Sequence, residues 1–196
     1  MRYYVVADVH GYYEELITAL TEKGFFEDKE PHKLIVCGDL FDRGYEAVKL
    51  QQFILELMDK DEVILIRGNH EDLAIELIEN IHKWMTAAVM YTHHWRNGTV
   101  ETVLQLTEMR LNEACKNPSE CAARMNETPF LKQLIPAMLD YFETENYIFV
   151  HGWIPTKSTQ IQAMPFSVEP LENFRSANKQ QWETARWYNG MWMSSL

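Results

Sequence analysis

The stretch "LIVCGDLFDRG" (residues 34–44) decides the fold class, because an apolar run ends abruptly in a group of charged residues. Leu34 to Cys37 suit a buried strand, and two carboxylates, a guanidinium and two glycines follow directly. Charged groups are costly to hold together unless they pair with one another or with an ion. The stretch therefore predicts a strand that leads into a polar site whose partners lie elsewhere in the chain.

Three further segments share the pattern of a buried strand followed by polar residues. They are "YYVVADV" (3–9), "EVILIRG" (62–68) and "NYIFVHG" (146–152). Together with "KLIVCGD" (33–39), which overlaps the first stretch, they make four predicted strands. Short apolar runs without strict alternation are typical of strands covered on both faces. Helical patterns at 12–24, with Gly24 expected as a C-cap, and at 46–60 lie between the first three. This alternation predicts a layered α/β domain in which neighbouring strands can be parallel.

Residues 72–145 have a different pattern, which we interpret as a helical insertion packed on the sheet. "DLAIELIENIHKWMTAAVMY" and "TVETVLQLTEMRLNEAC" are amphipathic at helical spacing, and Asn97-Gly98 predicts a turn between them. A third helix is expected from Thr128-Pro129, with a kink or break at Pro136. A last helix is expected around 176–187.

Composition limits the class of protein. The length of 196 residues suits a single domain, and the longest apolar runs are too short to span a bilayer. No secretory signal is expected in "MRYYVVADVHG". The three cysteines lack a CxxC spacing, so we expect reduced thiols in a cytoplasmic protein. The net charge of −11 disfavours a nucleic-acid partner but permits an anionic substrate, since bound cations can invert the local field.

Metal-ligand residue types follow all four predicted strands. These are Asp8 and His10, Asp39 and Asp42, Asn69 and His70, and His151. In open α/β sheets, ligands bind at the carboxyl edge. Asp8 and His10 are two residues apart and point to one face, so they can hold one divalent ion, while Asp39 can bridge to a second. Two ions about 3.5–4 Å apart clamp the attacking and leaving oxygens of a phosphoester. Mixed oxygen and nitrogen ligands suit Mn, Fe or Zn better than Ca.

Each motif also has a purely structural interpretation. An Asp-x-His at a strand end can cap a turn, "GDLFDRG" can precede a helix, and "GNHE" can form an Asn-mediated turn. Together, at four strand ends of one α/β unit, the motifs favour a functional site.

The motifs "DVHG" (8–11), "GDLFDRG" (38–44), "RGNHE" (67–71) and "VHG" (150–152) resemble a known family. They are similar to the metal-dependent serine/threonine phosphoprotein phosphatases, which belong to the calcineurin-like metallophosphoesterases, and the short chain looks like their compact bacterial or phage branch. The resemblance covers residues 1 to about 155. It implies a layered metallophosphoesterase-like fold with a mixed or parallel β core, helices outside, and two divalent metal ions, Mn being favoured.

The resemblance also implies roles for individual residues. The implied metal ligands are Asp8, His10, Asp39, Asn69 and His151. His70 would be the general acid that protonates the leaving alkoxide, and Asp42 would keep it cationic, since a carboxylate partner raises an imidazole pKa. Arg43 and Arg67 would hold the phosphoryl oxygens, for which a planar guanidinium is well suited.

The chain departs from the family pattern near its end. The family carries one further histidine on the second metal, and no histidine follows His151 here. "ETARWYNGMWMSSL" (183–196) resembles the family segment upstream of that histidine, which makes Arg186 a candidate phosphate ligand. We therefore expect one domain over 1–196 that lacks the C-terminal part of the family fold. His93-His94 are interpreted as a solvated helix end, and Glu71 and Asp72 as charges favoured at a helix N-terminus.

The sequence thus predicts a phosphomonoester hydrolase with a metal-activated water, acting as a serine/threonine protein phosphatase. The alternatives are hydrolysis of dinucleoside polyphosphates, or a catalytically impaired metal-binding remnant that binds phosphorylated partners. The expected partner is a phosphorylated protein or a small phosphoester, with no nucleic acid and no membrane.

Overall fold

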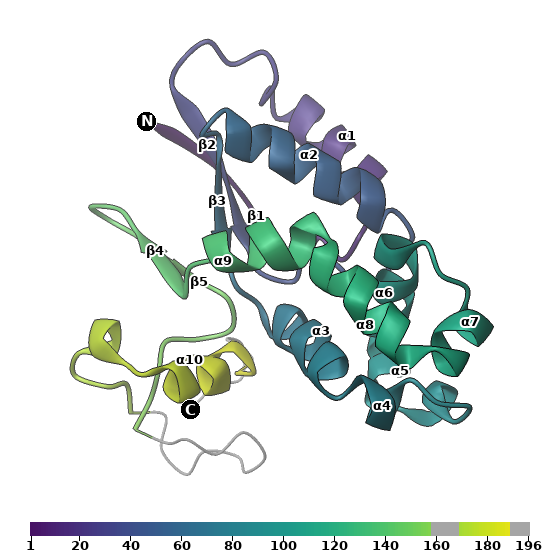
Figure 1. Cartoon of the computed structure of the whole chain (residues 1–196). Helices are drawn as coiled ribbons and strands as arrows, with labels where there is room; N and C mark the ends of the chain where they lie inside the picture. Colours follow the sequence, from purple (N-terminus) through teal and green to yellow (C-terminus); the bar gives the residue numbers. More distant parts are fainter. Residues whose placement is uncertain (158–168, 189–196) are drawn as a thin grey trace.

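The computed structural model describes residues 1–157 and 169–188, and its first part alternates strands with helices (Figure 1). The elements are β1 (Arg2–Val6), α1 (Tyr13–Glu22), β2 (His32–Cys37), α2 (Ala47–Asp59) and β3 (Val63–Ile66). The strands form a parallel sheet in the order β1-β2-β3, so the predicted layered α/β fold is confirmed.

The central strand β2 is buried on both faces. Leu34 and Val36 join the main core beneath the helices, whereas Ile35 and Cys37 join a smaller cluster on the opposite face. Alternate residues of a strand point to opposite faces, so a strand covered on both sides needs the continuous apolar run that the sequence shows.

The strands end earlier than the sequence patterns indicated. The runs at 3–9 and 33–39 were expected to stay extended through Asp8 and Asp39, but the strands end at Val6 and Cys37. Both aspartates have a φ of 53°, in the left-handed region, which a strand cannot accommodate. The backbone therefore turns out of the sheet where the polar residues begin.

The fourth predicted strand is present, but it lies in a separate two-stranded sheet and not in the parallel sheet. β5 (Ile148–Val150) pairs antiparallel with β4 (Tyr141–Glu143), a strand that the sequence patterns missed. Phe142 and Phe149 pack on the smaller core cluster, so this hairpin covers the sheet face opposite α1 and α2. A single parallel bridge between Ile66 and Leu139 joins its entry to the edge of β3.

The predicted insertion is helical but runs from Asn69 to Ala137. Its elements are α3 (Asn69–Glu79), α4 (Ile81–Trp84), a 3-10 turn (Val89–Tyr91), α5 (His93–Asn97), α6 (Thr99–Thr107), α7 (Leu111–Lys116), α8 (Pro118–Glu127), a π-helical turn (Phe130–Leu134) and α9 (Ile135–Ala137). The two long predicted helices are broken, at Asn80 and at Glu108, which has a φ of 54°.

The interpretation of His93-His94 as a solvated helix end is wrong for His94. Its side chain is fully buried, because α5 is a single short turn whose inner side packs on α3 and α6. The predicted turn at Asn97-Gly98 is confirmed, with Gly98 in the left-handed conformation between α5 and α6.

The last described helix lies beyond the hairpin. A 3-10 turn (Phe174–Ser176) precedes α10 (Lys179–Arg186), inside the predicted range 176–187. Trp182 of α10 stacks on Tyr141 of β4 at 5.4 Å, so α10 forms an outer layer against β4 and β5. The predicted domain (1–196) includes residues 158–168 and 189–196, which lie outside the described residues. Residues 189–196 also belong to the stretch 183–196 that resembles the end of the family pattern.

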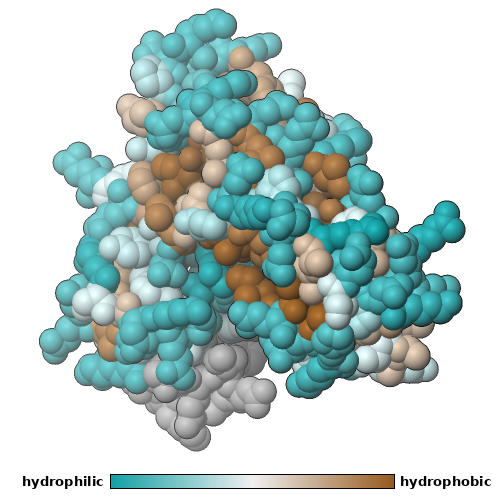
Figure 2. All heavy atoms as spheres, in the orientation of Figure 1, coloured by the Kyte–Doolittle hydropathy of each residue, from teal (hydrophilic) through white to brown (hydrophobic). Residues whose placement is uncertain are grey.

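The polarity of the visible surface and the free state of the cysteines agree with what the composition indicates. Hydrophilic side chains dominate the face in Figure 2, and hydrophobic ones gather towards its middle. Cys37, Cys115 and Cys121 are all free thiols. Within 1–157 and 169–188, no helix combines the length and the apolar character needed to cross a membrane.

Candidate active site at the carboxyl edge of the sheet

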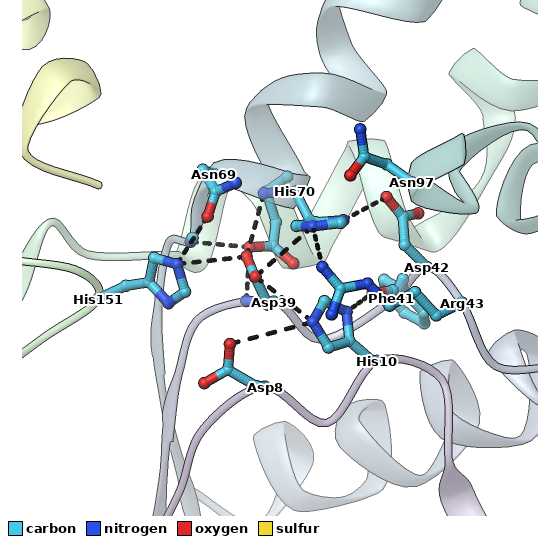
Figure 3. Close-up of polar contacts among 12 residues, drawn as sticks. Asp8, His10, Asp39, Phe41, Asp42, Arg43, Asn69, His70, Asn97 and His151 are labelled. Atoms are coloured by element: carbon cyan, nitrogen blue, oxygen red, sulfur yellow. Dashed lines mark hydrogen bonds and ion pairs between the residues drawn. The ribbon is translucent and has the colours of Figure 1, made fainter. Parts of the chain in front are cut away.

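The predicted ligands from four separate segments meet around Asp39 (Figure 3). One oxygen, Oδ2, lies 3.6 Å from His10 Nε2 and 3.8 Å from His70 Nε2. The other, Oδ1, lies 3.5 Å from His151 Nε2. Asp8 Oδ1 lies 3.9 Å from His10 Nε2. The structure therefore places the buried Asp39 carboxylate between two groups of candidate ligands, as a bridging role requires.

Backbone carbonyls fix which nitrogen of each imidazole faces the site. His10 Nδ1 lies 3.0 Å from the carbonyl oxygen of Phe41, and His151 Nδ1 lies 2.9 Å from that of Cys37. Only a protonated Nδ1 can hydrogen-bond a carbonyl, so the neutral imidazole presents an Nε2 lone pair to Asp39. Such backbone contacts are typical of metal-binding histidines.

Asn69 shows the same arrangement of acceptors. Its Oδ1 lies 2.8 Å from His151 Nε2, the nitrogen that carries the lone pair when Nδ1 donates to Cys37. Lone pairs that face one another repel unless a cation lies between them. Two groups of potential ligands meet here, Asp8-Asp39-His151 and His10-Asp39-His70. The donor chemistry therefore fits divalent cations on both sides of Asp39.

His70 points away from the lone pairs of His151 and towards Asp42. Its Nδ1 donates to Asp42 Oδ2 at 2.7 Å, and Arg43 Nη2 lies 3.2 Å from its Nε2. Burial lowers the pKa of His70, but the hydrogen bond that it donates to Asp42 and the charges of Asp39 and Asp42 outweigh burial, so the pKa is raised above the ordinary value. The site therefore favours a protonated imidazole at this position.

Two threonines that the sequence patterns did not indicate hold Asp42. Thr99 Oγ1 and Thr102 Oγ1 donate to its carboxylate at 2.7 and 2.8 Å. Both are buried residues of α6, so the helical insertion orients the partner of His70. Thr99 follows the Asn97-Gly98 turn directly, and the turn was the only signal that marked this corner.

Glu71 has a larger role than the predicted charge at a helix N-terminus. Its two oxygens accept the backbone N–H groups of Gly68, Leu40 and Asp39 at 2.7, 2.9 and 3.1 Å. Burial and the nearby charge of Asp39 raise its pKa to about 7, and the donated N–H groups limit that rise. Glu71 thus joins the loop after β3 to the loop that carries Asp39.

Backbone strain is concentrated at the site. Positive φ angles occur at Asp8, His10, Asp39, Asp42 and Arg43, with values of 53°, 53°, 53°, 75° and 63°. Each such residue costs about 1–3 kcal/mol and persists only where its surroundings hold it. Here backbone hydrogen bonds between the two loops do so, from His10 N to Asp39 O at 2.9 Å and from Asp8 N to Gly38 O at 3.3 Å.

The predicted phosphate-binding arginines have different surroundings. Arg43 is exposed. Arg67 pairs with Asp72 at 2.5 Å. Arg186 is buried and pairs with the same Asp72 at 2.8 Å and with Asp140 at 2.7 Å. Asp72 therefore ties α10 to the start of α3.

A cleft of about 400 Å³ opens over these groups. It is lined by Ala7, Asp8, Cys37, Asp39, Arg43, Asn69, His70, Val150, His151, Gly152, Arg186, Trp187 and Tyr188. Of the three candidate phosphate-binding arginines, Arg43 and Arg186 line the cleft. Arg67 is not one of the described residues that line it. The cleft joins the strand ends to the C-terminal end of α10.

Fold and donor set together define an α/β protein with a cation-binding cleft at the carboxyl edge of its sheet. The family model of the calcineurin-like phosphoesterases matches residues 1–192, so the chain belongs to that family. The resemblance to the calcineurin-like metallophosphoesterases is thereby confirmed, and with it a metallophosphoesterase fold. The groups of candidate metal ligands agree with the divalent metals that this family uses.

Two similar curated proteins are named as bis(5'-nucleosyl)-tetraphosphatases. A symmetrical bis(5'-nucleosyl)-tetraphosphatase of Buchnera aphidicola (subsp. Acyrthosiphon pisum, strain 5A) is 38% identical over 71 residues, which is 36% of this chain and 24% of that protein. The asymmetrical bis(5'-nucleosyl)-tetraphosphatase PrpE of Bacillus subtilis (strain 168) is 27% identical over 142 residues, 69% of this chain and 53% of that protein. The chain thus spans about half or less of these relatives.

Among solved structures, a cold-active protein tyrosine phosphatase matches at a TM-score of 0.47 and 21% identity, over 78% of this chain and 41% of that one. A likeness of this size supports no inference about the present chain.

Proposed function

We propose that the protein is a metal-dependent hydrolase that cleaves the phosphoanhydride chain of dinucleoside polyphosphates. The observation that carries the hydrolase assignment is the bridging position of Asp39, with imidazole nitrogens at 3.5 to 3.8 Å from its two oxygens. The substrate class is supported by the tetraphosphatases among its relatives. This reverses the order of the two enzymatic hypotheses drawn from the sequence.

The proposed metal ligands are those that the sequence predicted, namely Asp8, His10, Asp39, Asn69 and His151. Divalent cations at these ligands would neutralise phosphoryl charge and lower the pKa of a bound water. Asp39, whose two oxygens face different imidazoles, is the proposed shared ligand.

The chain's own acid is proposed to be His70. Its raised pKa favours the charged form, and the Asp42 contact at Nδ1 leaves the Nε2 proton to protonate the leaving oxygen once Arg43, whose Nη2 lies 3.2 Å from Nε2, turns to the phosphate. We assign the first phosphate contact to the exposed Arg43. Arg67 and Arg186 are engaged by Asp72, so any phosphate contact through them requires an exchange of ion partners.

An aromatic side chain at the cleft supports a nucleotide substrate. Trp187 lines the cleft and is 43% exposed. Exposed aromatic faces stack nucleobases, and each stacked base contributes about 1–3 kcal/mol to binding. A phosphopeptide offers such a ring only where its sequence contains an aromatic residue at the right distance, whereas every dinucleoside polyphosphate carries two.

The test compares two substrates and one substitution. With Mn²⁺ present, we expect faster hydrolysis of diadenosine tetraphosphate than of a phosphoserine peptide, and loss of both activities with a chelator. Trp187→Ala is expected to raise KM for diadenosine tetraphosphate about 5- to 150-fold, the equivalent of one lost stacking contact, and to leave KM for p-nitrophenyl phosphate unchanged. Preference for the phosphopeptide would support the protein phosphatase instead. Absence of turnover with metal bound would support the remnant.

A further inference from the structure

A second cluster of metal-ligand residues lies in the helical insertion, outside the cleft. Glu76 of α3 faces His93 and His94 of α5, and the Nε2 atom of each histidine lies 3.1 Å from the same oxygen, Glu76 Oε2. The two imidazole rings are 3.9 Å apart and tilted by 38°. All three ligand atoms lie within 4.8 Å of one another.

His94 is buried without a hydrogen-bond partner. Its side chain is fully buried, and neither ring nitrogen makes a hydrogen bond of acceptable geometry within the described part of the chain. An unsatisfied buried polar group costs about 1–3 kcal/mol. Its Nε2 points at a carboxylate oxygen that His93 already contacts. A cation between the three groups would give the Nε2 atom of His94 a partner.

The spacing fits a tetrahedral ion. With bonds of about 2.0–2.1 Å, ligand atoms at the corners of a tetrahedron are roughly 3.3 Å apart. The two nitrogen–oxygen separations of 3.1 Å are close to that edge length. Calcium would need six or more oxygens at longer distances, which this imidazole-rich group does not offer.

Surrounding contacts orient the carboxylate as they do in metal sites. Trp84 Nε1 donates to Glu76 Oε1 at 3.1 Å, which turns Oε2 towards the histidines. The Trp84 ring meets His93 and His94 edge-on, with centroids 5.0 and 5.2 Å away. Glu76 and His93 are 41% and 43% exposed, so an ion can enter and keep a water as its fourth ligand.

We propose that Glu76, His93 and His94 form a zinc-type site that ties α3 to α5. Two imidazoles and a carboxylate are a ligand set that suits Zn²⁺. The site is positioned to support the cleft, because the first turn of α3 carries Asn69 and His70 and α5 leads through Gly98 to Thr99, which holds Asp42. The site lies outside the cleft ligands, and its existence does not depend on the proposed activity.

Counting zinc in matched variants tests the proposal. We expect the wild type to bind one Zn²⁺ more than His93→Gln or Glu76→Gln, measured by mass spectrometry of the metal after dialysis. His82→Gln, which removes an exposed histidine bonded to Ser119, is the control and should keep the wild-type count. Equal counts in the wild type and in His93→Gln would overturn the proposal.

A second measurement separates this site from the cleft. Asp39→Asn weakens the cleft ligands, yet should retain one tightly bound Zn²⁺ and a zinc-dependent rise in Tm. Co²⁺ added to Asp39→Asn should give the visible absorption of a tetrahedral ion, and the double variant Asp39→Asn/His93→Gln should lack it. Loss of all zinc binding in Asp39→Asn alone would place every ion in the cleft and refute the second site.

Discussion

At the residue scale, Asp42 holds His70 through one nitrogen of its ring. Asp42 accepts from Nδ1 at 2.7 Å, so the ring cannot rotate without losing this hydrogen bond, while Arg43 Nη2, 3.2 Å from Nε2, can donate to His70 only when Nε2 is unprotonated. The imidazole ring of His70 also meets the ring of His10 edge-on, with the two ring centroids 4.7 Å apart. An acid held in this way acts only on a leaving group that approaches Nε2.

The leaving group therefore decides the cost of losing His70. His70→Asn should lower kcat by about 10²–10⁴-fold on a phosphoserine substrate, whose alkoxide must be protonated. The loss should be much smaller on p-nitrophenyl phosphate, because nitrophenolate leaves without a proton. Steady-state kinetics on both substrates, with the metal content of the variant measured alongside, check this. Equal losses on the two substrates would argue for a structural role of His70.

We predict that the Thr99 hydroxyl contributes to the stability of the protein through its hydrogen bond to Asp42. Thr99→Val keeps the shape of this fully buried side chain but removes the hydrogen bond to the Asp42 carboxylate, and should lower the free energy of unfolding by about 1–3 kcal/mol. Thr18→Val, which removes an exposed hydroxyl bonded to the Glu14 carbonyl, should change it by less than about 0.5 kcal/mol. Urea unfolding of the two variants would show whether they separate.

The sequence predicts those candidate site residues that directly follow a strand in the chain. Asp8, His10, Asp39 and Asn69 follow apolar strands, and parallel strands bring their carboxyl ends to one edge. The contacts of Thr99 with Asp42, 57 residues apart, depend on how the insertion packs, and no local pattern carries that information.

At the scale of elements, the corner between α5 and α6 sets the position of Arg43. Gly98 has a φ of +85°, and a Cβ added to it would lie 2.2 Å from the backbone nitrogen of Arg43. Gly24, after α1, has a φ of +75° with open space around it. The two glycines therefore share a backbone conformation and differ in their surroundings.

That difference gives a matched pair of variants. Gly24→Ala should cost about 1–2 kcal/mol of stability from its left-handed backbone alone. Gly98→Ala should cost about 1–3 kcal/mol more, because the overlap forces the α5–α6 corner away from Arg43, and should also reduce kcat. Thermal unfolding and kinetics of both variants measure this. Similar losses in the two variants would show that the close approach is relieved without consequence.

Element boundaries were the least predictable part of the fold, and the reasons are local. α1 ends as expected before Gly24, because glycine tolerates the left-handed cap, with Phe25 N bonded to Leu20 O at 2.9 Å. The long pattern from 72 breaks at Asn80, where apolar spacing continues through the break into Ile81. Periodicity reports the buried side of a segment and does not report whether its axis turns.

At the scale of the whole molecule, the layers explain why the cleft depends on distant parts of the chain. The ends of the parallel strands supply most of the candidate ligands and the β4–β5 hairpin supplies His151. The insertion orients Asp42, and α10 is attached through the pairing of Arg186 with Asp72. Each partner of this pair has a further ion partner, Arg67 for Asp72 and Asp140 for Arg186. The cleft is thus formed where three parts of the chain meet.

Stability of the metal-free protein should depend on pH through His94. Burial and the neighbouring His93 lower the pKa of His94 to about 4, although the charges of Glu76 and Asp42 oppose this. A histidine whose pKa is depressed in the folded state stabilises the protein above its unfolded pKa of about 6.5, and this stabilisation is lost as the pH falls towards 4. In the presence of a chelator, the free energy of unfolding of the wild type should therefore fall by about 1–3 kcal/mol more than that of His94→Gln between pH 7 and pH 4.5.

Glu71, whose raised pKa acts in the opposite direction, is common to both proteins, so its contribution to the pH dependence cancels in the comparison. Urea unfolding across this range measures the difference, with His82→Gln expected to follow the wild type; parallel curves for the wild type and His94→Gln would contradict the prediction.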